Sequence, residues 1–226
     1  MGIRKKIMKF RIWLSAKLWY GGNPDETMAK RFKLFVGVAV LLIGVSKLLY
    51  LTGVTLPNVE LIIPTLVVVG AFSLYTGGGK NWEKVRKYFG LIALLSVLLI
   101  DLVFWGFKTI YLFTWPAFVL CWFLGMRKDL SFFDKFSDLA VKATLTGAVA
   151  ILAFDMITAF GTWLLWRPLT LGALYGVYAA QVPFTFYHLA SLIFIPPLVG
   201  FGKIVSRVKM KVPVAVKAKV KERERR

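Results

Sequence analysis

Long apolar runs, separated by short polar links, occupy most of the chain. The runs lie at roughly residues 34–52, 59–77, 88–106, 109–125, 139–165 and 181–203. A helix needs about 20 predominantly apolar residues to cross a hydrocarbon core about 30 Å thick. The pattern therefore predicts an all-α integral membrane protein, folded as a compact six-helix transmembrane bundle and placed in the cell membrane as a multi-pass protein.

Composition limits what else the chain can contain. Hydrophobic residues make up 58% of the 226 positions, more than a soluble domain needs. No polar stretch is longer than the N-terminal one, which is shorter than the roughly 50 residues of a small domain. We predict three parts: a basic amphipathic segment at 1–33, a membrane domain at 34–203 and a basic tail at 204–226.

The basic residues of the links alternate along the chain. Residues 78–87 contain four Lys and Arg and residues 126–138 contain three, whereas the other three links contain one or none. Lys and Arg beside membrane helices mark the cytoplasmic side. Both termini and the two basic links are therefore predicted to be cytoplasmic.

Both ends of the chain are strongly basic. Of the 30 Lys and Arg, 9 lie in residues 1–34 and 10 in residues 203–226, within a net charge of +19. Because both clusters flank spans, we expect anionic lipids and not nucleic acid as their partner. Apolar residues recur at helical spacing in 3–18, which predicts an amphipathic helix on the inner leaflet. A basic arm without fixed structure is the alternative.

Cysteine and histidine each occur once, as Cys121 and His188. One cysteine cannot form an internal disulfide, and two such residues far apart do not form a metal cluster. No base follows Cys121 at a catalytic spacing, so we interpret it as a packing residue. The sequence predicts no metal site and no cofactor.

Two polar residues lie deep inside predicted spans. Asp155 is 11 residues inward of Trp166, or about 16 Å along a helix, and His188 is seven residues inward of Gln181, or about 11 Å. Their spans are consecutive and antiparallel, so the two side chains can meet. Such a contact would neutralise the carboxylate and orient the imidazole. It can serve a substrate site, a proton relay, or only a helix–helix tie worth about 0.6 kcal/mol.

Each of these residues belongs to a polar stripe on one helix face. Asp155, Thr158 and Thr162 follow helical spacing on the fifth span, and Gln181, Thr185 and His188 do so on the sixth. Apolar walls with a few placed polar groups are typical of small-molecule sites. The predicted substrate-binding residues are Asp155, Thr158, Thr162, Trp163, Gln181, Phe184, Thr185, Tyr187 and His188. We expect residues 167–180 to form a re-entrant or lid segment over the outer mouth, and Pro183 to loosen the helix beside His188.

Three segments are similar to a known family. "YLFTWPAFVLCWFLGM" (111–126), "DMITAFGTWLLW" (155–166) and "QVPFTFYHLASLIFIPPLVG" (181–200) resemble the last three helices of the substrate-binding S components of energy-coupling-factor transporters. The resemblance covers about residues 109–203. It implies six helices, an outward-open site for a vitamin or precursor, and no enzymatic activity. It also implies a transmembrane coupling subunit and ATPase subunits as partners.

Two other functions remain open from the residues alone. Asp155 and His188 could be the acid–base pair of a membrane enzyme acting on a lipid or lipid-linked substrate, although neither a nucleophile nor a metal cluster accompanies them. The chain could also be an accessory membrane subunit without a ligand. The glycine-rich stretch "TGGGKNW" (76–82) lacks the spacing of a phosphate-binding loop.

Overall fold

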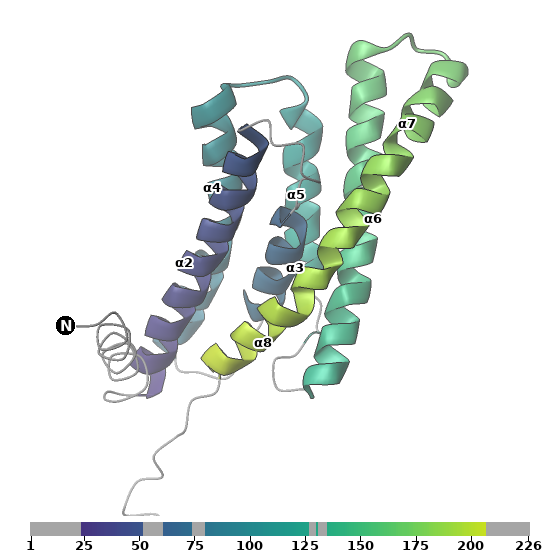
Figure 1. Ribbon diagram of the computed structural model, residues 1–226. Coiled ribbons are helices and arrows are strands. Elements are labelled where there is room, and N and C mark those ends of the chain that lie inside the picture. The colour runs from purple at the N-terminus through teal and green to yellow at the C-terminus, as the bar shows by residue number, and fades with distance from the viewer. Residues whose placement is uncertain (1–23, 52–60, 74–79, 127–129, 131–134, 207–226) are drawn as a thin grey trace, which may run out of the picture.

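The computed structural model describes residues 24–51, 61–73, 80–126, 130 and 135–206. These residues are helical and contain no strand, which confirms the predicted all-α class (Figure 1). The predicted amphipathic helix at 3–18 and most of the basic tail lie outside the described residues. The elements are α2 (Pro24–Leu51), α3 (Ile62–Ser73), α4 (Lys80–Trp105), α5 (Tyr111–Gly125), α6 (Phe136–Trp166), α7 (Leu171–Ala190), η1 (Ser191–Phe194) and α8 (Ile195–Ser206).

Two helices begin earlier than the sequence pattern predicted. α2 begins at Pro24 and not at residue 34, so it crosses the predicted boundary between the N-terminal segment and the membrane domain. Proline is well tolerated at a first helical position, because the N–H that it lacks has no partner there. α4 begins at Lys80, so most of the predicted basic link 78–87 forms its first two turns.

The largest difference concerns the sixth span. Residues 167–180 were expected to form a re-entrant or lid segment, but only a four-residue turn separates α6 from α7, which begins at Leu171. Thr170 caps α7, since its side-chain oxygen accepts a hydrogen bond from the N–H of Ala173. Helix α7 then continues without a break through Pro183.

The core is built around the short helix α3. Every residue from Leu61 to Phe72 is buried, and α3 contacts α2, α4, α5, α6 and α8. Phe72 stacks on Phe35 of α2 with ring centroids 4.9 Å apart. Such a helix, apolar on all sides, is stable only when neighbours surround it.

Helices α3 and α5 approach closely through two glycines. A Cβ atom added to Gly125 would lie 2.1 Å from the carbonyl oxygen of Val67, and one added to Gly70 would lie 2.3 Å from that of Trp122. No side chain fits at such distances from a neighbouring backbone. Glycine is therefore required at both positions for this helix crossing.

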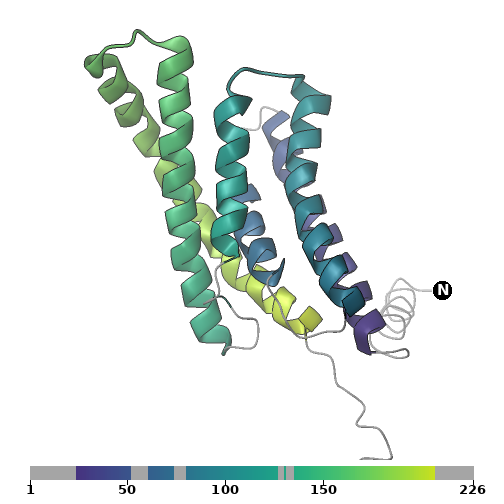
Figure 2. The same ribbon diagram turned by 180° about the vertical axis from the view of Figure 1, so that it is seen from behind.

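Helices α7 and α8, joined by η1, form one long rod that crosses the molecule diagonally (Figure 2). At one end α7 packs against α6, whereas at the other α8 packs against α2, α3 and α6. The tight 3₁₀ turn η1 directly precedes Pro196 and Pro197. Both prolines lack the N–H that an α-helix would use there, which explains the local change in winding.

The outer surface of the bundle is apolar along most helices. Leu41, Val103, Leu145 and Ile193 are each more than 60% exposed, and many other large apolar side chains are exposed beside them. Two continuous helical stretches, Phe136–Trp166 and Leu171–Ile204, are long and apolar enough to span a membrane. The apolar stretches Ile62–Phe72, Leu91–Trp105 and Tyr111–Gly125 are shorter.

Candidate functional site

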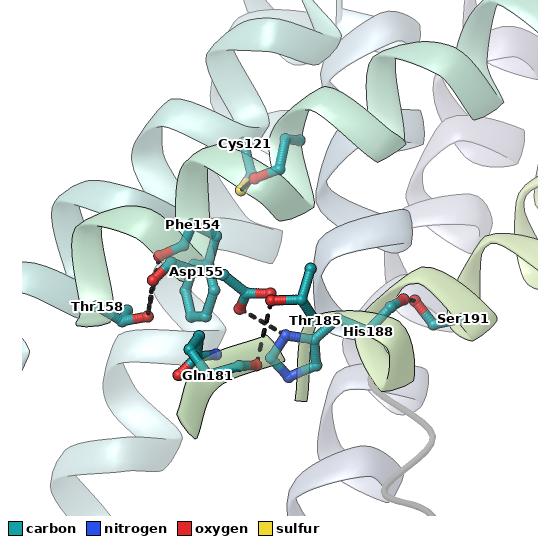
Figure 3. A network of polar contacts seen from close by, with 9 residues as sticks. Cys121, Phe154, Asp155, Thr158, Gln181, Thr185, His188 and Ser191 are labelled. Atoms are coloured by element: carbon teal, nitrogen blue, oxygen red, sulfur yellow. Dashed lines mark hydrogen bonds and ion pairs between the residues drawn. The ribbon is translucent and has the colours of Figure 1, made fainter. Parts of the chain in front are cut away.

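The predicted contact between Asp155 and His188 is present. Nδ1 of His188 on α7 lies 2.7 Å from Oδ1 of Asp155 on α6 (Figure 3). Nδ1 can donate to this oxygen when it carries a hydrogen, and the tautomer of the imidazole decides the direction of the bond. The ring of Phe154 stands edge-on to the imidazole and packs on Phe118 of α5, so the pair is held between three helices.

The second oxygen of Asp155 is buried and unpaired within the described part of the chain. The Asp155 side chain is 3% exposed, and its Oδ2 is buried without a hydrogen bond to any described residue. Buried polar atoms are nearly always hydrogen-bonded, because an unpaired one loses its hydration without compensation. This oxygen can therefore accept a hydrogen bond from a ligand or a water molecule, or it can bind a proton.

The hydroxyl groups of the two polar stripes bond to their own helices. Thr158 and Thr162 each donate to the carbonyl oxygen four residues earlier in α6, and Thr185 donates to that of Gln181 in α7. This pattern satisfies the hydroxyl hydrogen inside a helix. Each oxygen can still accept a hydrogen bond, so the threonines are available as acceptors.

A cavity of about 490 Å³ lies between the C-terminal end of α6, the turn that follows it, and α7. Three predicted site residues line it, namely Thr162, Gln181 and Phe184. Asp155, Thr158, Thr185 and His188 do not line it. His188 follows Phe184 by four residues on α7, so it lies about one helical turn from this residue of the cavity wall.

The remaining two predicted residues have other surroundings. Trp163 donates its indole N–H to the carbonyl oxygen of Thr170 and thereby ties the end of α6 to the turn. The hydroxyl oxygen of Tyr187 is buried and has no hydrogen-bond partner among the described residues. Neither side chain lines the cavity.

The sequence did not indicate the rest of the cavity wall. Arg167 and Pro168 of the turn and Ala173, Gly176, Val177 and Ala180 of α7 complete it. All six lie in the segment 167–180 that was expected to be a re-entrant or lid segment. A helical interpretation of that segment would have placed Ala173, Gly176 and Ala180 on one face, at the spacing that α7 shows.

A second buried polar cluster joins α2, α4 and α5. Nζ of Lys47 lies 2.6 Å from Oδ1 of Asp101, and the indole N–H of Trp115 donates to Oδ2 at 3.3 Å. The same ammonium lies over the rings of Trp105 and Phe118. The sequence pattern did not indicate the pairing of Lys47 with Asp101. Both oxygens of Asp101 are satisfied, so the cluster has the form of a structural tie.

The remaining sulfur and carboxylate groups bear on two sequence predictions, a packing cysteine and the lack of a metal site. Cys121 is fully buried, and its sulfur lies 3.6 Å from the carbonyl oxygen of Ala150, which agrees with a packing role. Among the residues that the structure describes, no three His, Cys, Asp or Glu side chains group as metal ligands.

Comparison with known proteins adds no relative. No protein-family model, no curated protein and no solved structure matches the chain.

Proposed function

We propose that this chain is the membrane-embedded substrate-binding subunit of an uptake system for a small organic nutrient, such as a vitamin or precursor. One observation carries the proposal: the polar stripes of α6 and α7 meet at a partly buried Asp155–His188 pair next to a cavity of about 490 Å³. That volume lies in the range of small-molecule sites, which are mostly apolar with a few polar groups.

The proposal places the helices in the cell membrane as six spans. The exposed apolar side chains of α2, α4, α5 and α6 would face lipid, which a soluble surface of this extent would not tolerate. The α4–α5 and α6–α7 turns lie at one end of the molecule, and the starts of α2 and α6 and the end of α8 lie at the other (Figure 1). The positive-inside rule then makes both termini cytoplasmic and directs the cavity outward.

The proposed uptake requires partners. Accumulating a nutrient against its gradient consumes free energy, and the glycine-rich stretch of this sequence lacks the spacing that binds nucleotide phosphates. We infer a transmembrane coupling subunit and ATPase subunits, as in energy-coupling-factor transporters, whose S components the last three helices resemble. The chain itself would bind its ligand and would not act as an enzyme.

Ligand-dependent stability tests the binding role. Purified protein in nanodiscs is heated with each member of a panel of water-soluble vitamins and precursors. A ligand that binds only the folded state raises the midpoint of unfolding, by about 2.7 kcal/mol of stability at 100 times its Kd. We expect at least one such ligand, and we expect His188→Ala and Asp155→Asn to weaken its binding tenfold or more, since hydrogen bonds to charged groups contribute about 1.5–3 kcal/mol.

Thr144→Ala is the matched control, because Thr144 also donates to a carbonyl of α6 but lies three turns inward of Asp155. If ligand binding is unchanged in both His188→Ala and Asp155→Asn, the pair only ties the two helices together. Proteoliposomes with this chain alone should not concentrate the ligand, and accumulation without ATPases would contradict the role of partners.

The Asp155–His188 pair also supports a second candidate. A carboxylate that orients an imidazole through Nδ1 is the arrangement of a general base. A membrane enzyme acting on a lipid or lipid-linked substrate could use it. Mass spectrometry of lipids retained by the purified protein separates the two functions, because an enzyme of this kind should retain and convert a specific lipid.

A further inference from the structure

The cavity between α6 and α7 has an asymmetric charge. Among the described residues that line it, Arg167 is the single charged one and none is a carboxylate. The Arg167 side chain is exposed and makes no ion pair with any described residue. Arginine presents a planar fork of N–H donors that matches a carboxylate or phosphate group, so this end of the cavity is prepared for an anion.

The N-terminus of α7 adds positive electrostatic potential near Arg167. Ala173, in the first turn of α7, lines the cavity beside Arg167 and Pro168. The N-terminus of a helix has a partial positive charge, and α7 has 20 residues. The arginine and the helix terminus therefore favour negative charge at the same mouth.

The wall that α7 forms is apolar and unobstructed. Gly176, Val177, Ala180 and Phe184 line it along one side of α7. A Cβ atom added to Gly176 would have no atom within 4 Å, so this glycine leaves open space and does not serve close packing. Gln181 and Thr162 provide polar atoms beside this wall.

We propose that this cavity binds an organic anion: a carboxylate or phosphate group at Arg167, with an apolar body against Gly176 and Phe184. The inference rests on the proposed function and names the substrate class of that site. The anion could belong to a water-soluble metabolite or to an anionic lipid headgroup, and the two sources share this chemistry. Asp155 and His188, one turn further in, would face the far end of the ligand.

Three probes with the same apolar body test the charge preference. These are 5-phenylpentanoate, 5-phenylpentan-1-ol and 5-phenylpentylamine, each titrated against protein in phosphatidylcholine nanodiscs with the shift in unfolding temperature as readout. We expect the carboxylate to bind at least tenfold more tightly than the amine or the alcohol, as the loss of a charge-assisted hydrogen bond implies. Equal binding of all three, or no shift with the carboxylate, would overturn the inference.

Matched variants locate the binding. Arg167→Gln should weaken carboxylate binding tenfold or more, and Arg167→Lys should retain part of it because the charge remains. Gly176→Leu should abolish binding by filling the cavity. Gly172→Leu is the control, since Gly172 also faces open space but does not line the cavity. Variants are compared only if their unfolding temperature without probe equals that of the native chain within a few degrees.

The remaining outcomes separate this inference from the proposed function. If the amine binds best and Gly176→Leu abolishes its binding, the cavity is a ligand site but the anion inference is wrong. If phosphatidylglycerol nanodiscs without probe stabilise the native chain but not Arg167→Gln, the anion is a lipid and nutrient binding there is contradicted. Carboxylate binding that is unchanged in both Arg167→Gln and Gly176→Leu would place the probe elsewhere and overturn the inference.

Discussion

Single residues decide how closely the helices of this bundle can approach. Gly125 and Gly70 let α3 and α5 meet backbone to backbone, whereas Gly44 on α2 and Gly37 have open space around them. Sequence alone does not distinguish these glycines, because all four lie in apolar runs. The difference comes from which face each helix turns toward α3, and that is a tertiary property.

Alanine substitution separates the two kinds of glycine. Gly125→Ala places a methyl group against the backbone of Val67, which cannot move aside cheaply, so we expect destabilisation of about 1–3 kcal/mol. Gly44→Ala should instead stabilise by about 0.5–1 kcal/mol, since alanine has the better helix propensity and meets no neighbour. Thermal unfolding in nanodiscs measures both. Equal shifts for the two variants would show that the α3–α5 crossing is looser than described.

The Asp155–His188 contact could be predicted at this scale, whereas the cavity could not. The depth of the Asp155–His188 contact followed from counting residues along two consecutive antiparallel helices. The short turn between such helices fixes which residues of one lie beside which residues of the other. Lys47 and Asp101 also have matching depths, but they belong to the first and third spans, and sequence does not say that α2 packs against α4. Structure adds the missing neighbour relation.

At the scale of elements, the Lys47–Asp101–Trp115 cluster joins three helices. Asp101 is 3% exposed and accepts from both Lys47 and Trp115. Helices α4 and α5 have few other contacts, and the hydrogen bond from Trp115 to Asp101 connects them.

Removing one partner should therefore be costly. Lys47→Met leaves Asp101 charged and buried without its cation, and breaking a buried pair in this way costs about 3–5 kcal/mol. The double variant Lys47→Met/Asp101→Asn removes both charges and should recover most of that loss. A double-mutant cycle of unfolding free energies checks it. Additive effects of the two substitutions would contradict a coupled pair.

The boundary of α7 shows why element ends were predicted incorrectly. The apolar stretch Leu171–Ile204 has 34 residues, which is longer than a span of about 20 needs. The predicted span of about that length was placed on the C-terminal part of the stretch, which contains Pro183 and His188. Residues 171–180 were then left over and were assigned to the link between spans. The rod is instead long and diagonal, and a hydrophobic stretch longer than the bilayer is thick is accommodated by tilting.

At the scale of the whole molecule, the α6–α7 hairpin is distinct from the rest. α7 contacts α6 and η1 and has no fully buried residue, whereas α3 is enclosed by five helices. The hairpin ends at the same end of the molecule as the α4–α5 turn (Figure 1). The sequence predicted this common end from the alternation of basic links, because charge bias depends on local composition and not on packing.

Cysteine labelling in a Cys121→Ala background tests the orientation. Lys108→Cys in the α4–α5 turn and Leu169→Cys in the α6–α7 turn are exposed at the end predicted to face outward, and Ser137→Cys is exposed at the other end. A membrane-impermeant maleimide should label the first two in intact cells and Ser137→Cys only after permeabilisation. Labelling of Ser137→Cys alone in intact cells would invert the topology and direct the cavity to the cytoplasm. Labelling of all three would mean that these helices do not span the membrane, which would remove the basis for a nutrient-uptake subunit.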